Sequence, residues 1–159
     1  MPAFPFRVAL YSHDTCGLGH LRRNLLIGNA LLSSGVASSV LLISGAHEAN
    51  QFHLPDGFDM VTLPSVQKRD DGTYRARRLH IGLGELSGIR ASLIRSAVES
   101  FQPDLIIVDN VPRGANGELE LTLEFLASRP GTRGVLGLRD ILDQPEAIRA
   151  EWSRLRNVE

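Results

Sequence analysis

Two histidines and two glycines lie close together near the start of the chain, in the segment Ser12-His13-Asp14-Thr15-Cys16-Gly17-Leu18-Gly19-His20. An imidazole with an ordinary pKa of about 6.5 can accept a proton from a hydroxyl group near neutral pH. Glycine allows backbone N–H groups to come close to a bound molecule. The segment therefore predicts a site for an anionic or multiply hydroxylated ligand, with histidine acid–base chemistry beside it.

The flanking residues predict how this segment is held. Residues 8–11 are typical of a buried strand, and residues 21–32 are typical of an amphipathic helix. A strand that leads through glycines into a helix directs N–H groups and the positive end of the helix dipole at one place. Two interpretations of His20 stay open. It is either a proton acceptor or a first-turn residue that hydrogen-bonds a loop carbonyl.

The apolar pattern switches repeatedly between strand and helix periods along the rest of the chain. We expect further strands at 40–43, 60–63, 105–108 and 135–138, and further helices at 86–101, 119–127 and 145–155, with a short helix before the third strand. The expected apolar face of the helix at 86–101 includes Ile89 and Leu93. This alternation predicts one α/β domain over residues 1–159, a Rossmann-like doubly wound parallel sheet of about five strands with helices on both faces. The expected strand order is 3-2-1-4-5. Residues 65–83 are expected to be an irregular loop, rich in charge.

Ligands of such sheets bind beyond the carboxyl ends of the strands, where the strand order reverses. Polar side chains follow the predicted strands at Ser12, His13, Asp14, Ser44, His47, Ser65, Asp109, Asn110, Arg139 and Asp140. The expected order brings the His13–His20 loop opposite Asp109. That carboxylate either orients a ligand hydroxyl or a histidine, or is a satisfied group at a strand end. Arg22 and Arg23 are expected on the surface of the first helix.

Composition excludes several classes of function. The chain has 159 residues and a net charge of −1, which gives no overall field to attract nucleic acid. A single cysteine fits a reducing compartment, and no apolar stretch is long enough to cross a membrane. A leader sequence is not evident, so we expect a cytoplasmic protein.

Common cofactor motifs are also incomplete. No lysine follows a glycine loop, so a Walker-type phosphate site is not expected. The Gly17-Leu18-Gly19 turn lacks the third glycine of a dinucleotide fingerprint, where Arg22 stands. No Gly-x-Ser-x-Gly sequence is present, and the histidines and Cys16 lack zinc spacing. We therefore predict no metal and no cofactor.

The segment 13–23 resembles the first glycine loop of MurG-type enzymes, the glycosyltransferase family 28-like branch of the GT-B fold. It is similar in particular to bacterial proteins labelled predicted glycosyltransferases. Further matching motifs span nearly the whole chain: Pro103-Asp104-Leu105, Val108-Asp109-Asn110-Val111-Pro112 followed by Gly117-Glu118-Leu119, and residues 136–143. The loop departs from the Gly-Gly-x-Gly-Gly-His pattern of MurG itself, so its substrate is not carried over.

The resemblance implies the N-terminal, acceptor-side domain of an inverting enzyme, with a nucleotide-sugar donor, an acceptor that is lipid-linked or carries phosphate, and no essential metal. It implies that His20 is the candidate base; Asp109 is the second expected catalytic residue, with an orienting role. The residues expected to bind substrate are His13, Asp14, Thr15, Gly17, Leu18, Gly19, Asn110 and Arg139. The enzyme would be cytoplasmic, at most peripheral to the inner face of the membrane.

The resemblance further implies a second domain, which holds the donor. It would lie beyond Glu159 or on a partner chain, so we expect residues 1–159 to be cut from a longer polypeptide and to be inactive alone. Two alternatives stay open: one half of a nucleotide-sugar 2-epimerase, and a non-catalytic subunit that binds the acceptor or docks a partner.

Overall fold

The computed structural model describes residues 5–13, 18–69, 73–138 and 145–154. A five-stranded, fully parallel sheet forms the centre, in the order β3-β2-β1-β6-β7. Its strands are β1 (Arg7–Tyr11), β2 (Ser39–Ser44), β3 (Phe58–Thr62), β6 (Leu105–Asp109) and β7 (Arg133–Gly137). The order confirms the predicted arrangement, because β6 and β7 are the fourth and fifth strands of this sheet.

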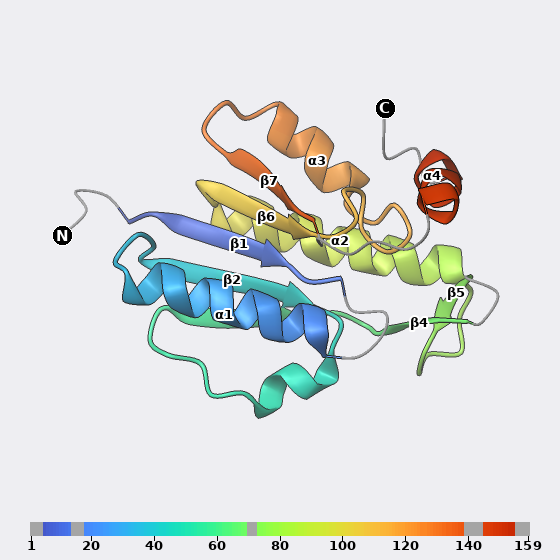
Figure 1. Ribbon diagram of the computed structural model, residues 1–159, viewed down its shortest axis with the longest axis horizontal. Coiled ribbons are helices and arrows are strands. Elements are labelled where there is room, and N and C mark those ends of the chain that lie inside the picture. Colours follow the sequence, from blue (N-terminus) through green and yellow to red (C-terminus); the bar gives the residue numbers. More distant parts are fainter. Residues whose placement is uncertain (1–4, 14–17, 70–72, 139–144, 155–159) are drawn as a thin grey trace.

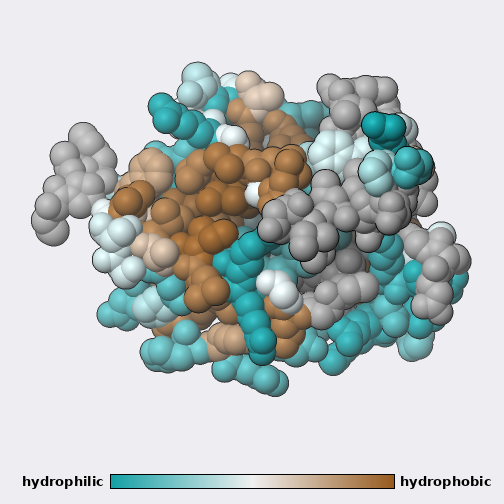
Figure 2. Space-filling model, in the orientation of Figure 1, coloured by the Kyte–Doolittle hydropathy of each residue, from teal (hydrophilic) through white to brown (hydrophobic). Residues whose placement is uncertain are grey.

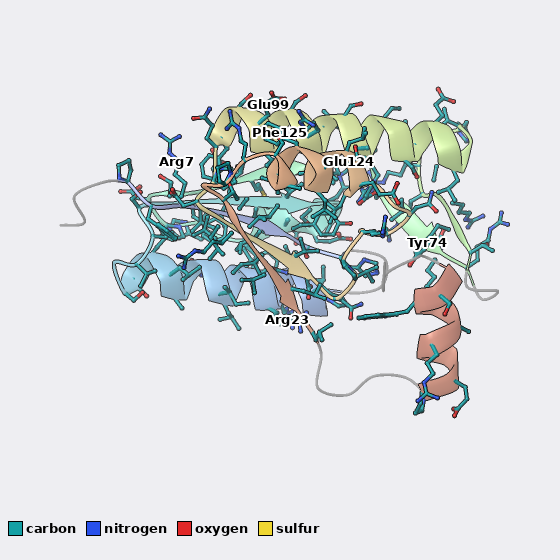
Figure 3. The ribbon with its side chains drawn as sticks, turned by 90° about the horizontal axis from the view of Figure 1, so that it is seen from above. Arg7, Arg23, Tyr74, Glu99, Glu124 and Phe125 are labelled. Atoms are coloured by element: carbon teal, nitrogen blue, oxygen red, sulfur yellow. The ribbon has the colours of Figure 1, made fainter. Side chains whose placement is uncertain are left out.

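Helices lie on both faces of the sheet, as predicted (Figure 1). Helix α1 (Gly19–Ser33) lies on one face, and α2 (Leu83–Phe101) and α3 (Glu120–Ala127) lie on the other (Figure 3). The short helix η1 (His47–Gln51) follows β2, and α4 (Pro145–Arg154) lies beyond the carboxyl ends of the strands. The chain is therefore a Rossmann-like α/β fold.

Alternating side chains of the central strands fill two separate cores. Val8 and Leu10 of β1 pack on the α1 side, whereas Ala9 and Tyr11 pack on the α2 side. All four side chains are fully buried. A strand covered on both faces needs apolar residues at every position, which is why this run does not alternate between apolar and polar.

The ends of the long helices follow their local sequence. Gly35, just after α1, has a φ of +73°, a backbone conformation that glycine adopts without strain. Gln102 ends α2 with a φ of +51°, directly before Pro103. Both ends lie close to where the sequence predicted them.

Two predictions for the region from 65 to 101 were wrong. Residues 65–83 are not wholly irregular, because β4 (Val66–Lys68) and β5 (Tyr74–Ala76) form an antiparallel hairpin. Each strand has three residues, too few for a clear alternating pattern. In α2, the predicted apolar face included Ile89 and Leu93, which the structure leaves exposed, whereas it buries Arg90.

An apolar area occupies the side of the sheet that faces the viewer in Figure 2, over the region of β6 and β7. Val135 of β7 is paired with Ile107 of β6 and is 48% exposed, and Leu26 of α1 is 70% exposed. No helix among the described residues has the length and apolar character needed to cross a lipid bilayer.

Candidate active site

The clearest polar contact joins the first turn of α1 to the end of β6. His20 donates a hydrogen bond from Nδ1 to Oδ2 of Asp109 over 2.7 Å. A carboxylate only accepts hydrogen bonds, so Nδ1 carries the proton and the lone pair of the neutral ring lies on Nε2. The His20 side chain is 13% exposed and that of Asp109 is 3% exposed. The two residues therefore meet as the predicted strand order required.

Two further side chains of α1 reach the same carboxylate. Arg23 forms an ion pair with Oδ1 of Asp109, and Asn24 donates to Oδ2 over 3.2 Å. Asn24 also donates to the backbone carbonyl of His20 over 2.9 Å. Positions i, i+3 and i+4 lie on one face of a helix, so the three side chains converge on one point.

Arg23 and Asn24 belong to the candidate site, although the sequence analysis assigned neither of them to it. Arg22 and Arg23 were both expected on the helix surface; Arg22 is exposed, whereas Arg23 is half-buried because it turns toward Asp109. Figure 3 shows Arg23 on the α1 side of the sheet. Asn24 was not predicted at all. Its spacing from His20 was the available signal, since a polar residue at i+4 shares the face of the candidate base.

His13 is buried beside this group. Its ring lies edge-on to that of His20, with ring centroids 5.7 Å apart and an angle of 82° between the planes. The pKa of His13 is lowered to about 3, mainly by burial and to a smaller extent by electrostatic interaction with His20, Lys68 and Arg90. His13 is therefore neutral at physiological pH.

The start of α1 has the features of an anion site. Leu18 is the N-cap residue, no side chain of the described residues caps the helix, and the first turn carries no acidic residue. A β-carbon added at Gly19 would meet none of the described residues within 4 Å. Uncapped N–H groups and the positive end of the helix dipole favour negative charge there.

Other predicted residues have local roles. Asn110 has a φ of +68°, and its N–H donates to the carbonyl of Gly137 over 2.8 Å. Ser44 accepts a hydrogen bond from the N–H of Ala46 over 3.1 Å. Ser12 is buried, and its N–H donates to the carbonyl of Ile43 over 3.0 Å. These contacts fix the backbone around the candidate site.

Several predicted positions lie outside the described residues, so their predictions stay untested: Asp14, Thr15, Cys16, Gly17, Arg139 and Asp140.

A second polar cluster lies on the α2 side of the sheet, and sequence reasoning missed it. Arg90 of α2 donates from Nε and Nη2 to both carboxylate oxygens of Glu118, over 2.5 and 2.6 Å. The Tyr11 hydroxyl donates to Oε1 of Glu118 over 2.5 Å and accepts from the N–H of Ala115 over 3.2 Å. The signal was an arginine four residues from Leu86 and from Ile94, inside the apolar stripe of α2.

The surroundings of Arg90 and Tyr11 shift the pKa values of both side chains. Burial by itself lowers the pKa of Arg90, but the hydrogen bonds and charge of Glu118 more than offset this and raise it overall. Burial also raises the pKa of Tyr11 well above its usual value, and the neighbouring Glu118 adds to this rise. The cluster therefore holds a guanidinium, a carboxylate and a neutral phenol.

Comparison of the chain with protein-family models, with curated proteins and with solved structures finds no match. The chemistry of the site must therefore be argued from its geometry. That geometry offers one partly accessible imidazole with its proton fixed on Nδ1, one buried neutral imidazole beside it, and an uncapped helix start.

Proposed function

We propose that this domain is the acceptor-side half of a GT-B glycosyltransferase, which moves a sugar from a nucleotide-sugar donor to a hydroxyl group of an acceptor. One observation carries the proposal. A partly accessible histidine is oriented by a buried carboxylate at the carboxyl end of a Rossmann-like sheet, beside the point where the strand order reverses. A general base for a hydroxyl nucleophile needs this arrangement.

In the proposed reaction, Nε2 of His20 accepts the proton of the acceptor hydroxyl as its oxygen attacks the anomeric carbon of the donor. The new carbon–oxygen bond forms while the bond to the nucleotide diphosphate breaks, and the diphosphate leaves with the electron pair. Asp109 holds the ring by its Nδ1–H and stabilises the imidazolium that forms. The single displacement inverts the anomeric centre.

The surroundings of His20 support this role. His13 is neutral, so it presents a polar ring to the site without adding a positive charge. The uncapped start of α1 offers N–H groups to phosphate or hydroxyl groups of a substrate. Under this proposal the donor is held by a second domain, and residues 1–159 alone do not turn over.

The proposal is tested in the longest natural reading frame that contains these residues, with a panel of nucleotide sugars and hydroxylated acceptors. His20→Ala should lower kcat about 10²- to 10⁴-fold with a smaller change in KM, because a general base acts in the transition state. His53→Gln is the matched control, since His53 is exposed and lies outside the site.

Three results would contradict the proposal. A change in KM alone after His20→Ala would exclude the base. Rapid turnover by residues 1–159 would exclude the need for a second domain. Conversion of a nucleotide sugar to its epimer without any acceptor would assign the site to an epimerase instead.

A further inference from the structure

Arg90 is the largest fully buried side chain among the described residues, and the proposed reaction does not use it. It comes from α2, yet its guanidinium ends at the same edge of the sheet as the candidate site. A buried ion pair is weak evidence for stability alone, because desolvation offsets much of the attraction between the charges.

The guanidinium lies against segments that follow three different strands and is hydrogen-bonded to two of them. Two of its nitrogens bind Glu118, beyond β6, and Nη1 donates to the carbonyl of Pro64, beyond β3, over 2.6 Å. Beyond β2, a β-carbon added at Gly45 would lie 2.8 Å from Nη1. Glu118 in turn accepts from Tyr11, the last residue of β1. The hydrogen bonds of Arg90 and Glu118 thus link the carboxyl ends of β1, β3 and β6, and the guanidinium lies close to the segment after β2.

The same cluster leads directly to the candidate site. Tyr11 precedes His13 by two residues, and the charge of Arg90 is felt at His13. His13 in turn packs edge-on against the ring of His20. A change in the cluster therefore has a short route to the candidate base.

We infer that Arg90 is a positioning residue, which fixes the segments around the candidate site through Glu118 and Tyr11 and so sets the placement of His13 against His20. Its importance for sugar transfer rests on the proposed function. Its effect on the segments and on His13 does not, and can be measured on the chain itself.

Two variants separate position from charge. Arg90→Lys keeps the positive charge but loses the planar fork that reaches both oxygens of Glu118 and the carbonyl of Pro64. The double variant Arg90→Met with Glu118→Leu removes both charges and leaves an apolar pair that is compatible with folding. Arg95→Met is the matched control, because Arg95 lies on the same helix in a partly exposed ion pair with Glu99.

The first readout is amide hydrogen exchange. In both Arg90 variants, the amides of residues 44–46, of Ser65 and of the non-proline residues in 111–119 should exchange at least about tenfold faster, while α1 should be unchanged. The second readout is the titration of His13 by NMR. The groups facing it are His20, Lys68 and Arg90, so its pKa should rise from about 3 in the double variant and less in Arg90→Lys. Arg95→Met should alter neither.

In the full reading frame, the double variant should lower kcat about tenfold with little change in KM for the donor. Unchanged exchange and unchanged His13 titration in the double variant would overturn the inference, whatever the activity. If exchange and titration change as expected while His20→Ala leaves transfer intact, the positioning role stands and the proposed function fails.

Discussion

The two polar clusters, around Asp109 and around Glu118, contain the same kinds of side chain but differ in how deeply these are buried. Each pairs an acidic residue from the end of β6 or the segment after it with an arginine from a helix. Arg23 of α1 meets Asp109 on one side of the sheet, and Arg90 of α2 meets Glu118 on the other. The side chains of Arg23 and Asp109 are 34% and 3% exposed, whereas those of Arg90 and Glu118 are 1% and 0% exposed.

This difference in burial suits the two arginine–carboxylate pairs to different roles. A guanidinium that is one-third exposed can exchange its carboxylate for water or for a ligand at little cost, because solvent screens the pair. A fully buried guanidinium cannot leave its partner without becoming an unpaired charge in a medium of low polarity. The Asp109 cluster therefore suits binding and proton transfer, and the Glu118 cluster suits fixing the fold around them.

The largest effect is expected from removing Glu118. Glu118→Ala leaves Arg90 charged and buried without its partner, so it should lower the free energy of unfolding by about 3–5 kcal/mol. Urea denaturation followed by circular dichroism measures this change. Glu120→Ala is the control, since Glu120 forms an exposed ion pair with Arg113, and it should cost less than about 1 kcal/mol. Equal effects of the two substitutions would remove the distinction between buried and exposed pairs.

Alanine substitutions at Gly45 and Gly19 compare the two clusters, because each adds one methyl group beside one of them. In Gly45→Ala the new methyl group would meet Nη1 of Arg90, which cannot move aside because Pro64 and Glu118 hold the guanidinium. We expect a loss of up to about 3 kcal/mol.

Gly19→Ala is the opposite case, because no described residue would meet the new methyl group at the start of α1. It should leave the free energy of unfolding unchanged or raise it by up to about 1 kcal/mol. Thermal denaturation of both variants measures the difference, and a larger loss for Gly19→Ala would contradict this expectation.

The sequence predicted one cluster and not the other, for a physical reason. Strand order and the rule for ligand sites in parallel sheets were enough to bring His20 opposite Asp109, because both follow predicted strands. Arg90 lies in the middle of a helix, and the topology alone does not say which distant carboxylate it reaches. Its contacts depend on a loop conformation that includes Gly114, at a φ of +77°. Local patterns do not specify such a loop.

The buried imidazole gives the next effect, which depends on pH. The pKa of His13 is about 3 in the folded state, below the ordinary value of the unfolded chain, so only the unfolded chain takes up a proton between these values. Stability should therefore be complete above pH 7 and fall with acidification, by about 2 kcal/mol between pH 7 and pH 5.

Urea denaturation across this range should show a smaller acid loss in His13→Gln, which has no imidazole to protonate. The control His53→Gln should keep the slope of the native chain. If the free energy of unfolding of the native chain did not change between pH 7 and pH 5, His13 would be exposed to water rather than buried.

Only a small loss of stability is expected from a substitution of the carboxylate at the candidate site. Asp109→Asn keeps an oxygen that can accept from Nδ1 of His20, and Arg23, already one-third exposed, can turn toward water. The free energy of unfolding should fall by about 1 kcal/mol, well below the effect of Glu118→Ala. Sugar transfer by the full reading frame should nevertheless fall at least about 10²-fold, because a neutral amide no longer stabilises the imidazolium. A loss of stability as large as that of Glu118→Ala would show that Asp109 serves the fold rather than the reaction.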